Sequence, residues 1–277
     1  MRIVYDLHTH TLKSDGTLTP TELVERAASA GVQVLALTDH DVTDGIPEAQ
    51  AVAARVGLQL VPGVEVSVTW QGRTIHIIGL GIRHDDDALA VGLAGQRQTR
   101  NQRGREIGER LERAGVENAY AGARAWSHGE ILSRTHFARY LVEAGYAGDI
   151  GKAFKKYLSC GKAGFVRCEW VGLEECLGWI HGAGGQAVIA HPGRYAMGSG
   201  TLRRLLGEFR DGDGDGIEVI CGNYNQNEAE RFTRLADDFG LLASCGSDFH
   251  GPEQRWRELG RLPMFPDGCI PIWRDWA

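Results

Sequence analysis

The sequence predicts an α/β protein, built as a closed β/α barrel that carries a helical insertion. Short apolar runs alternate with helical patterns at both ends of the chain, and this β-α-β rhythm indicates a largely parallel sheet. Histidine and carboxylate motifs follow the apolar runs, as at the rim of such a barrel. Between residues 88 and 167 the strand rhythm stops, and helical patterns take its place.

The N-terminal part contains four apolar runs that we expect to be strands. A helix is expected between the first two runs, because Thr19 suits the N-cap and Pro20 the first helical position. Gly31 ends this helix shortly before the second run. The four expected strands are residues 3–7, 34–37, 58–66 and 74–82.

The middle of the chain reads as a long Arg/Glu-rich helix followed by two shorter helices. These are expected at residues 94–114, 136–145 and 149–158, and strands resume at 186–190, 217–220 and 241–244. We therefore expect a discontinuous barrel of residues 1–90 and 168–277. Residues 91–167 are expected to form a helical subdomain over the active-site mouth.

Composition excludes several classes of function. The formal charge of −6 is unlike that of a protein that coats nucleic acid, although a local basic pocket is compatible with it. The six cysteines form no Cys-x-x-Cys pair, so a thiolate zinc site is not expected. No apolar stretch is long enough for a signal peptide or membrane span. We expect a cytoplasmic enzyme with no membrane contact and no obligate protein partner.

Six of the ten histidines and three carboxylates lie at or near the ends of the expected strands. His8 and His10 are separated by one residue, so on an extended strand their side chains point to the same face. His250 follows Asp248 with the same spacing. Because parallel strands deliver their C-terminal ends to one rim, we expect the nine side chains to converge. They are His8, His10, Asp15, His40, Glu65, His76, His191, Asp248 and His250.

Imidazoles and carboxylates without thiolates suit Mn²⁺, Zn²⁺ or Fe²⁺. Nine ligands exceed the requirement of one ion, so we expect two or three divalent cations, with Mn²⁺ as the first expectation. Cations that share a carboxylate can activate a water molecule placed between them.

The motifs His8-Thr9-His10, Thr38-Asp39-His40, Gly63-Val64-Glu65, His191-Pro192 and Asp248-Phe249-His250 resemble those of the polymerase-and-histidinol-phosphatase (PHP) family. This resemblance implies a distorted seven-stranded β/α barrel. It also implies three ligand groups. The first would be His8, His10, Glu65 and Asp248, and the second Glu65, His76 and His191. The third would be Asp15, His40 and His250, which would contact the substrate directly if no cation occupies that site.

Two further segments resemble the PHP subgroup that removes the 3′-phosphate from 3′,5′-nucleoside bisphosphates: residues 133–139, Ser-Arg-Thr-His-Phe-Ala-Arg, and 190–194, Ala-His-Pro-Gly-Arg. Guanidinium binds phosphate through two parallel hydrogen bonds, so Arg134 and Arg194 are the first candidate phosphate contacts. Thr135 and His136 are candidate helpers.

Two arginines of the long helix are further candidates for a second phosphate. Arg100 lacks an i, i+4 partner and Arg103 has only Glu106 nearby. Residues 223–225, Asn-Tyr-Asn, follow an expected strand and are an additional candidate contact.

The expected reaction is in-line hydrolysis, in which a water shared by the cations loses its proton and attacks phosphorus. If His40 and His250 are not both bound to a cation, one of them would protonate the leaving oxygen, with Asp15 orienting the donor. The substrate is expected to be a small nucleotide such as adenosine 3′,5′-bisphosphate, hydrolysed to AMP.

Three alternatives remain open. The first is a 5′-3′ exoribonuclease that acts on short RNA, and the second is a histidinol-phosphate phosphatase. The third is a non-catalytic metal-binding or polymerase-accessory module, which the complete ligand set disfavours.

Overall fold

The computed structural model describes residues 3–222, 224–254 and 258–276. Its sheet follows the order β1-β2-β3-β4-β6-β7-β8, and a short β5 pairs with β3. Hydrogen bonds from Leu7 N to Cys245 O (3.0 Å) and from Asp248 N to His8 O (2.9 Å) connect the β8 side to the β1 side. The seven strands of the main path thus form a nearly closed barrel, as expected for a PHP-type fold.

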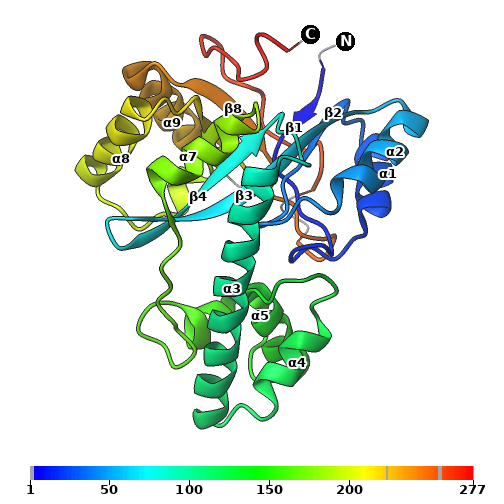
Figure 1. The fold of residues 1–277 in the computed structure, drawn as a ribbon, viewed down its shortest axis with the longest axis vertical. Helices are drawn as coiled ribbons and strands as arrows, with labels where there is room; N and C mark the ends of the chain where they lie inside the picture. The colour runs from blue at the N-terminus through cyan, green and yellow to red at the C-terminus, as the bar shows by residue number, and fades with distance from the viewer. Residues whose placement is uncertain (1–2, 223, 255–257, 277) are drawn as a thin grey trace.

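Short strands alternate with helices at both ends of the chain (Figure 1). The strands are β1 (Tyr5–Asp6), β2 (Val34–Leu37), β3 (Gln59–Trp70), β4 (Arg73–Leu80), β5 (Val171–Gly172), β6 (Gln186–Ile189), β7 (Gly216–Cys221) and β8 (Leu242–Gly246). The helices around them are α1 (Pro20–Ser29), α2 (Ile46–Val56), α7 (Leu173–Gly182), a 3-10 turn (Pro192–Arg194), α8 (Ser199–Asp211) and α9 (Gln226–Phe239). Figure 1 shows α1 and α2 on one side of the barrel and α7, α8 and α9 on the other.

Local chemistry explains where the first helix begins and ends. The Thr19 side chain accepts a hydrogen bond from Glu22 N, and the Glu22 carboxylate accepts one from Thr19 N. Pro20 occupies the first turn, as predicted. After the helix, Gly31 takes a left-handed backbone conformation (φ 85°), so the chain turns into β2 without steric cost.

Strand β4 is the exception in an otherwise parallel sheet, because it pairs antiparallel with both β3 and β6. Strand β3 also continues beyond the position expected for its end, forming a hairpin with β4. Glu65 therefore lies inside β3 and not at a strand end, and it pairs with His40 in the segment that follows β2. Because β4 runs in the opposite direction, its first half, which contains His76, lies at the rim where the parallel strands end.

The middle of the chain forms a helical group with its own apolar core. Helix α3 (Asp87–Arg113) runs away from the barrel, and α4 (Ala119–Ala125) and α5 (Arg134–Glu143) pack beside it (Figure 1). A short α6 (Ile150–Ala153) continues into a π-helical turn (Phe154–Leu158). Buried side chains such as Ile107, Phe137 and Leu141 hold the group together.

The expected helix boundaries need correction at two N-termini. Helix α3 starts seven residues earlier than predicted, because the Asp86 side chain accepts hydrogen bonds from Ala88 N and Leu89 N. The expected domain boundary at residue 91 thus falls inside α3. Helix α5 starts at Arg134, where Ser133 is the N-cap.

Within the described ranges, no helix combines the length and apolarity that a bilayer crossing requires.

Candidate metal centre

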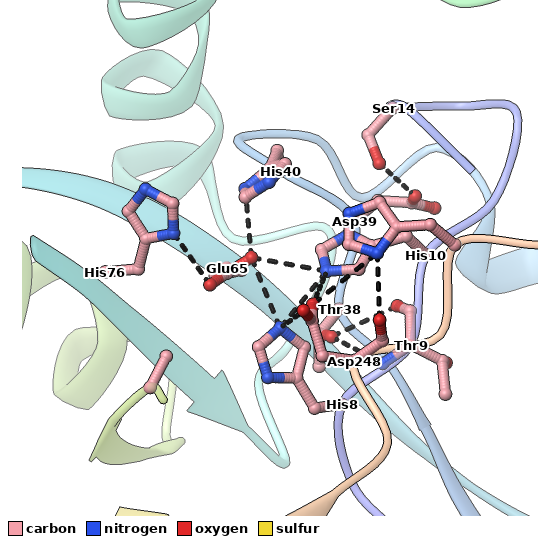
Figure 2. Close-up of polar contacts among 12 residues, drawn as sticks. His8, Thr9, His10, Ser14, Thr38, Asp39, His40, Glu65, His76 and Asp248 are labelled. Carbon is pink, nitrogen blue, oxygen red and sulfur yellow. Dashed lines mark hydrogen bonds and ion pairs between the residues drawn. The ribbon is translucent and has the colours of Figure 1, made fainter. Parts of the chain in front are cut away.

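The nine predicted ligand side chains lie together at one rim of the barrel. Eight are buried, and His76 is half-buried. Ser67 pairs with His76 across β3 and β4, and Glu65 lies two residues before Ser67, so Glu65 and His76 face the same side of the sheet. Figure 2 shows Glu65 between His76 on one side and His8 and His10 on the other.

The first ligand group has the dimensions of a cation site. His8 Nε2 lies 3.1 Å from His10 Nε2, 3.2 Å from Glu65 Oε2 and 3.3 Å from Asp248 Oδ1. Four donors held about 2.0–2.2 Å from one tetrahedral ion would be roughly 3.3–3.6 Å apart. Two imidazole nitrogens facing each other at this distance need a proton or a cation between them. The arrangement fits the first group implied by the family resemblance.

Glu65 connects this group to a second one. Its Oε2 faces His8, His10 and also His40 Nδ1, which is 3.0 Å away. Its Oε1 lies 2.8 Å from both His76 Nδ1 and His191 Nε2. One carboxylate therefore presents one oxygen to each group, as a bridging ligand does.

The third group contains His10, Asp15, His40 and His250. Asp15 Oδ1 lies 3.3 Å from His250 Nε2 and 3.9 Å from His40 Nε2. Its other oxygen accepts a hydrogen bond from the Ser133 hydroxyl (2.9 Å), at the start of α5. The helical group thus contacts the rim directly at a predicted ligand.

Several buried polar atoms at the rim have no hydrogen-bond partner among the described residues. They are His10 Nδ1, Asp15 Oδ1, His40 Nδ1, Glu65 Oε2 and His191 Nδ1. Buried polar groups normally have partners, so a cluster of this kind points to a ligand that the protein atoms alone do not supply. Imidazole and carboxylate donors at these spacings fit divalent cations.

The charges of the ligand groups depend on each other. Burial alone would raise the pKa of Glu65, yet the imidazoles of His40, His8 and His76 hold it well below its usual range. Burial, assisted by Arg194, lowers the pKa of His191 to about 3. Both groups are therefore in the ligand form, carboxylate and neutral imidazole, at neutral pH.

Three residues at the rim have a backbone conformation that is unusual for any residue other than glycine. Asp41, His191 and Asp248 have φ values of 52°, 29° and 52°. Each lies shortly after a strand end, where the chain must turn sharply. Strain of this kind persists where the surrounding structure enforces it, which is common at functional sites.

Two predicted phosphate contacts, Arg103 and Arg134, lack a carboxylate partner among the described residues. Arg103 Nε is buried, and no atom of the described residues accepts a hydrogen bond from it. Burial and the neighbouring Arg134 lower the pKa of Arg103 to about 9. The guanidinium of Arg134 lies over the Phe154 ring, 5.7 Å from its centroid. Two neighbouring guanidiniums with no carboxylate within ion-pair distance among the described residues have the chemistry that binds anions.

Arg100 differs from the expectation of an unpaired cation. It is buried and forms an ion pair with Asp41, and Nη2 also donates to Ser67 Oγ (2.7 Å). The sequence reasoning considered only helix neighbours, whereas the partner comes from the barrel. Arg194 also has a partner, because its Nη1 donates to Asp248 Oδ2, while about a third of its side chain remains exposed.

The helper residues at the start of α5 have different surroundings. His136 Nδ1 accepts a hydrogen bond from Ser133 N in the cap of the helix (3.1 Å). Burial lowers the pKa of His136 to about 4, so this imidazole is neutral. Thr135 N donates to Ser133 Oγ. Of residues 223–225, Asn223 lies outside the described residues, and Tyr224 is buried with its hydroxyl accepting from Gly193 N.

Two carboxylates were missed by sequence reasoning. Asp39 accepts hydrogen bonds from Thr11 and from the Ser14 hydroxyl, and so shapes the loop that leads to Asp15. Glu218 contacts His8 and His191 from β7. The sequence offered a signal for each: Asp39 is part of the Thr38-Asp39-His40 motif, and Glu218 is a charged residue in an otherwise apolar strand. Charged residues are rarely buried without a partner, so Glu218 could have been predicted to contact the site.

A β/α barrel whose rim gathers imidazoles and carboxylates into cation-sized groups is typical of metal-dependent hydrolases. A PHP domain model matches residues 6–165. The chain is 49% identical to a 3′,5′-nucleoside bisphosphate phosphatase of Chromobacterium violaceum, over 98% of this chain and 95% of the relative. It is 46% identical to a 5′-3′ exoribonuclease of Haemophilus influenzae, over 97% of each chain.

A solved amidohydrolase structure from Chromobacterium violaceum, with bound sulfate and no metal, matches with a TM-score of 0.94 at 49% identity, covering 98% of this chain and 94% of the other. The chain therefore belongs to the PHP family, and it is a metal-dependent phosphoesterase. The family expected from the motifs is confirmed.

Proposed function

We propose that this phosphoesterase removes the 3′-phosphate from 3′,5′-nucleoside bisphosphates. The main support is the pair Arg103 and Arg134, two neighbouring half-buried arginines that have no carboxylate within ion-pair distance among the described residues. A substrate with two phosphates would place one at the ligand groups and the other at this pair. The relative with 49% identity carries the name of this activity.

Divalent cations, when bound, would lower the pKa of water and neutralise phosphoryl oxygens. The first and second ligand groups would each hold one such cation, with Glu65 shared between them and Mn²⁺ as the expected metal. The third group would hold a further cation or, where that site is empty, contact the substrate directly. Asp15 Oδ1 lies within 4 Å of both His40 and His250 and would orient the imidazole that protonates the leaving oxygen. Residues 91–167 would form one wall of the substrate site, since Ser133 donates to Asp15.

A phosphate-release assay with Mn²⁺ tests this proposal. Adenosine 3′,5′-bisphosphate, adenosine 3′-monophosphate, AMP, histidinol phosphate and a 5′-phosphorylated RNA trimer would be compared. We expect the highest kcat/KM for the bisphosphate. Preference for histidinol phosphate would contradict the substrate assignment but would not affect the assignment of the metal ligands.

The cytoplasmic location expected from the sequence stays a prediction.

A second candidate function is 5′-3′ hydrolysis of short RNA, which the name of the relative with 46% identity favours. Both activities need a phosphate next to the scissile one, so the same arginine pair serves either. Release of mononucleotides from the 5′-phosphorylated trimer, and none from its 5′-hydroxyl form, would support this function.

Replacing Arg134 with methionine should remove the preference for a second phosphate. A charge-assisted hydrogen bond contributes about 1.5–3 kcal/mol, so kcat/KM for the bisphosphate should fall ~10–100-fold. The value for adenosine 3′-monophosphate should change much less, because that substrate lacks the second phosphate. Arg203→Met, which removes an exposed arginine of α8 paired with Asp238, is the matched control. An equal loss for both substrates would contradict this role of Arg134.

A further inference from the structure

A single buried carboxylate joins two of the predicted ligands. Glu218 lies in β7 and is 1% exposed. Its Oε1 accepts a hydrogen bond from His8 Nδ1 (3.0 Å), and its Oε2 accepts one from the backbone N–H of His191. His8 belongs to the first ligand group, whereas His191 contacts Glu65 Oε1 in the second.

The contact with His8 determines which ring nitrogen carries the proton. A carboxylate can only accept, so His8 Nδ1 must donate to Glu218. In the neutral ring, Nε2 then keeps its lone pair, and this is the atom that faces Glu65 and Asp248. A histidine that binds a metal through Nε2 needs this tautomer.

The contact with His191 acts on the backbone. His191 has a φ of 29°, outside the usual regions for a residue with a side chain. The hydrogen bond from its N–H to Glu218 holds this conformation, in which Nε2 points at Glu65 Oε1. Glu218 thereby orients both histidines.

The packing around Glu218 leaves little freedom for another arrangement. A Cβ atom at Gly246 would lie 2.3 Å from His8 Cβ and 3.0 Å from Glu218 Oε1, so only glycine fits there. Apart from His8, no described basic side chain lies within ion-pair distance of Glu218. Burying a carboxylate costs free energy unless hydrogen bonds and an opposite charge compensate it, and here His8 and the His191 N–H are the compensating groups.

We propose that Glu218 is a positioning residue for metal binding, which selects the Nε2-ligating tautomer of His8 and fixes the backbone of His191. It thus supports two cation sites without contacting either cation. The proposal depends on metal binding and is independent of which phosphate ester is the substrate.

The variant Glu218→Gln has nearly the same volume as the parent but can accept only one of the two hydrogen bonds, from His8 Nδ1 or from the His191 N–H. An amide has one oxygen and one NH₂ group, and the His191 backbone N–H can only donate, so the oxygen must turn to it. The NH₂ group then faces His8 Nδ1, which must accept, and the proton of the neutral ring moves to Nε2. That proton points into the first ligand group and competes with the cation.

Metal content and affinity are the readouts. Equilibrium dialysis with elemental analysis should show that Glu218→Gln weakens binding at one site by about 10–100-fold, as for other outer-shell partners of metal ligands. Circular dichroism and cooperative unfolding would verify the fold. Glu174→Gln, the same change at an exposed position in α7, should bind metal like the parent. A folded Glu218→Gln protein with parental metal affinity would overturn the proposal.

A second measurement uses the parent protein, so it does not depend on whether a variant folds. In the zinc-loaded parent, proton NMR should detect an exchange-protected ring N–H signal from His8 Nδ1, hydrogen-bonded to a carboxylate. A His8 ring with its proton on Nε2, or a metal on Nδ1, would overturn the proposal. Neither readout involves turnover, so a wrong substrate assignment would leave both unchanged.

Discussion

Glu65→Gln is expected to lower kcat by about 10³-fold or more while the fold stays intact. The two oxygens of Glu65 face different ligand groups, with Oε2 near His8 and His10 and Oε1 near His76 and His191. An amide nitrogen cannot replace a carboxylate oxygen as a ligand, so one cation loses a donor and the bridge is broken. Losing one preorganised electrostatic group at a reaction centre costs about 10²–10³-fold, and here two cation sites are affected.

Steady-state kinetics with the preferred phosphate ester and metal analysis of the dialysed protein check this expectation together. Glu230→Gln, an exposed glutamate of α9, provides the same change in net charge away from the rim. Parental turnover by a folded Glu65→Gln protein with a full metal complement would show that Glu65 is not a bridging ligand.

The barrel could be predicted from the sequence because its signals are local. Strand β2 has the predicted bounds, since a short apolar run between a helix and a polar motif has few other interpretations. The Thr19 cap is also a local signal, formed between residues three apart. The His8 and His10 spacing predicts a shared face from strand geometry alone.

Features that depend on distant pairing could not be predicted in this way. The direction of β4 was not recognised from the sequence, although Gln71 and Gly72, both with positive φ (46° and 71°), form a two-residue hairpin turn between β3 and β4. The pairing of β4 with β6, in contrast, depends on a distant part of the chain. The length of β3 likewise depends on its hairpin with β4. The partner of Arg100 is 59 residues away in the chain, so helix spacing gave no indication of it.

The second large effect, a loss of stability, is expected when the ion pair between Asp41 and Arg100 is broken. Asp41 is completely buried and Arg100 is 5% exposed, and their ion pair joins α3 to the rim loop directly after His40. Arg97 Nη1 also donates to the Asp41 carbonyl (3.1 Å). Replacing Arg100 with methionine leaves a buried carboxylate without its counter-ion. We expect the free energy of unfolding to fall by about 3–5 kcal/mol.

Denaturant titration of the metal-free protein measures this loss, and Arg55→Met is the matched control. Arg55 forms an ion pair with Glu25, but both side chains are more than half exposed, so its replacement should cost only about 0–1 kcal/mol. The double variant Asp41→Asn/Arg100→Met removes both charges and should recover part of the stability, because most of the cost comes from the uncompensated Asp41. A double variant no more stable than Arg100→Met would indicate that Arg100 acts mainly through its contacts with Trp170 and Ser67. Recovery would show that a charge pair, and not apolar packing alone, fixes the helical group to the metal-bearing rim.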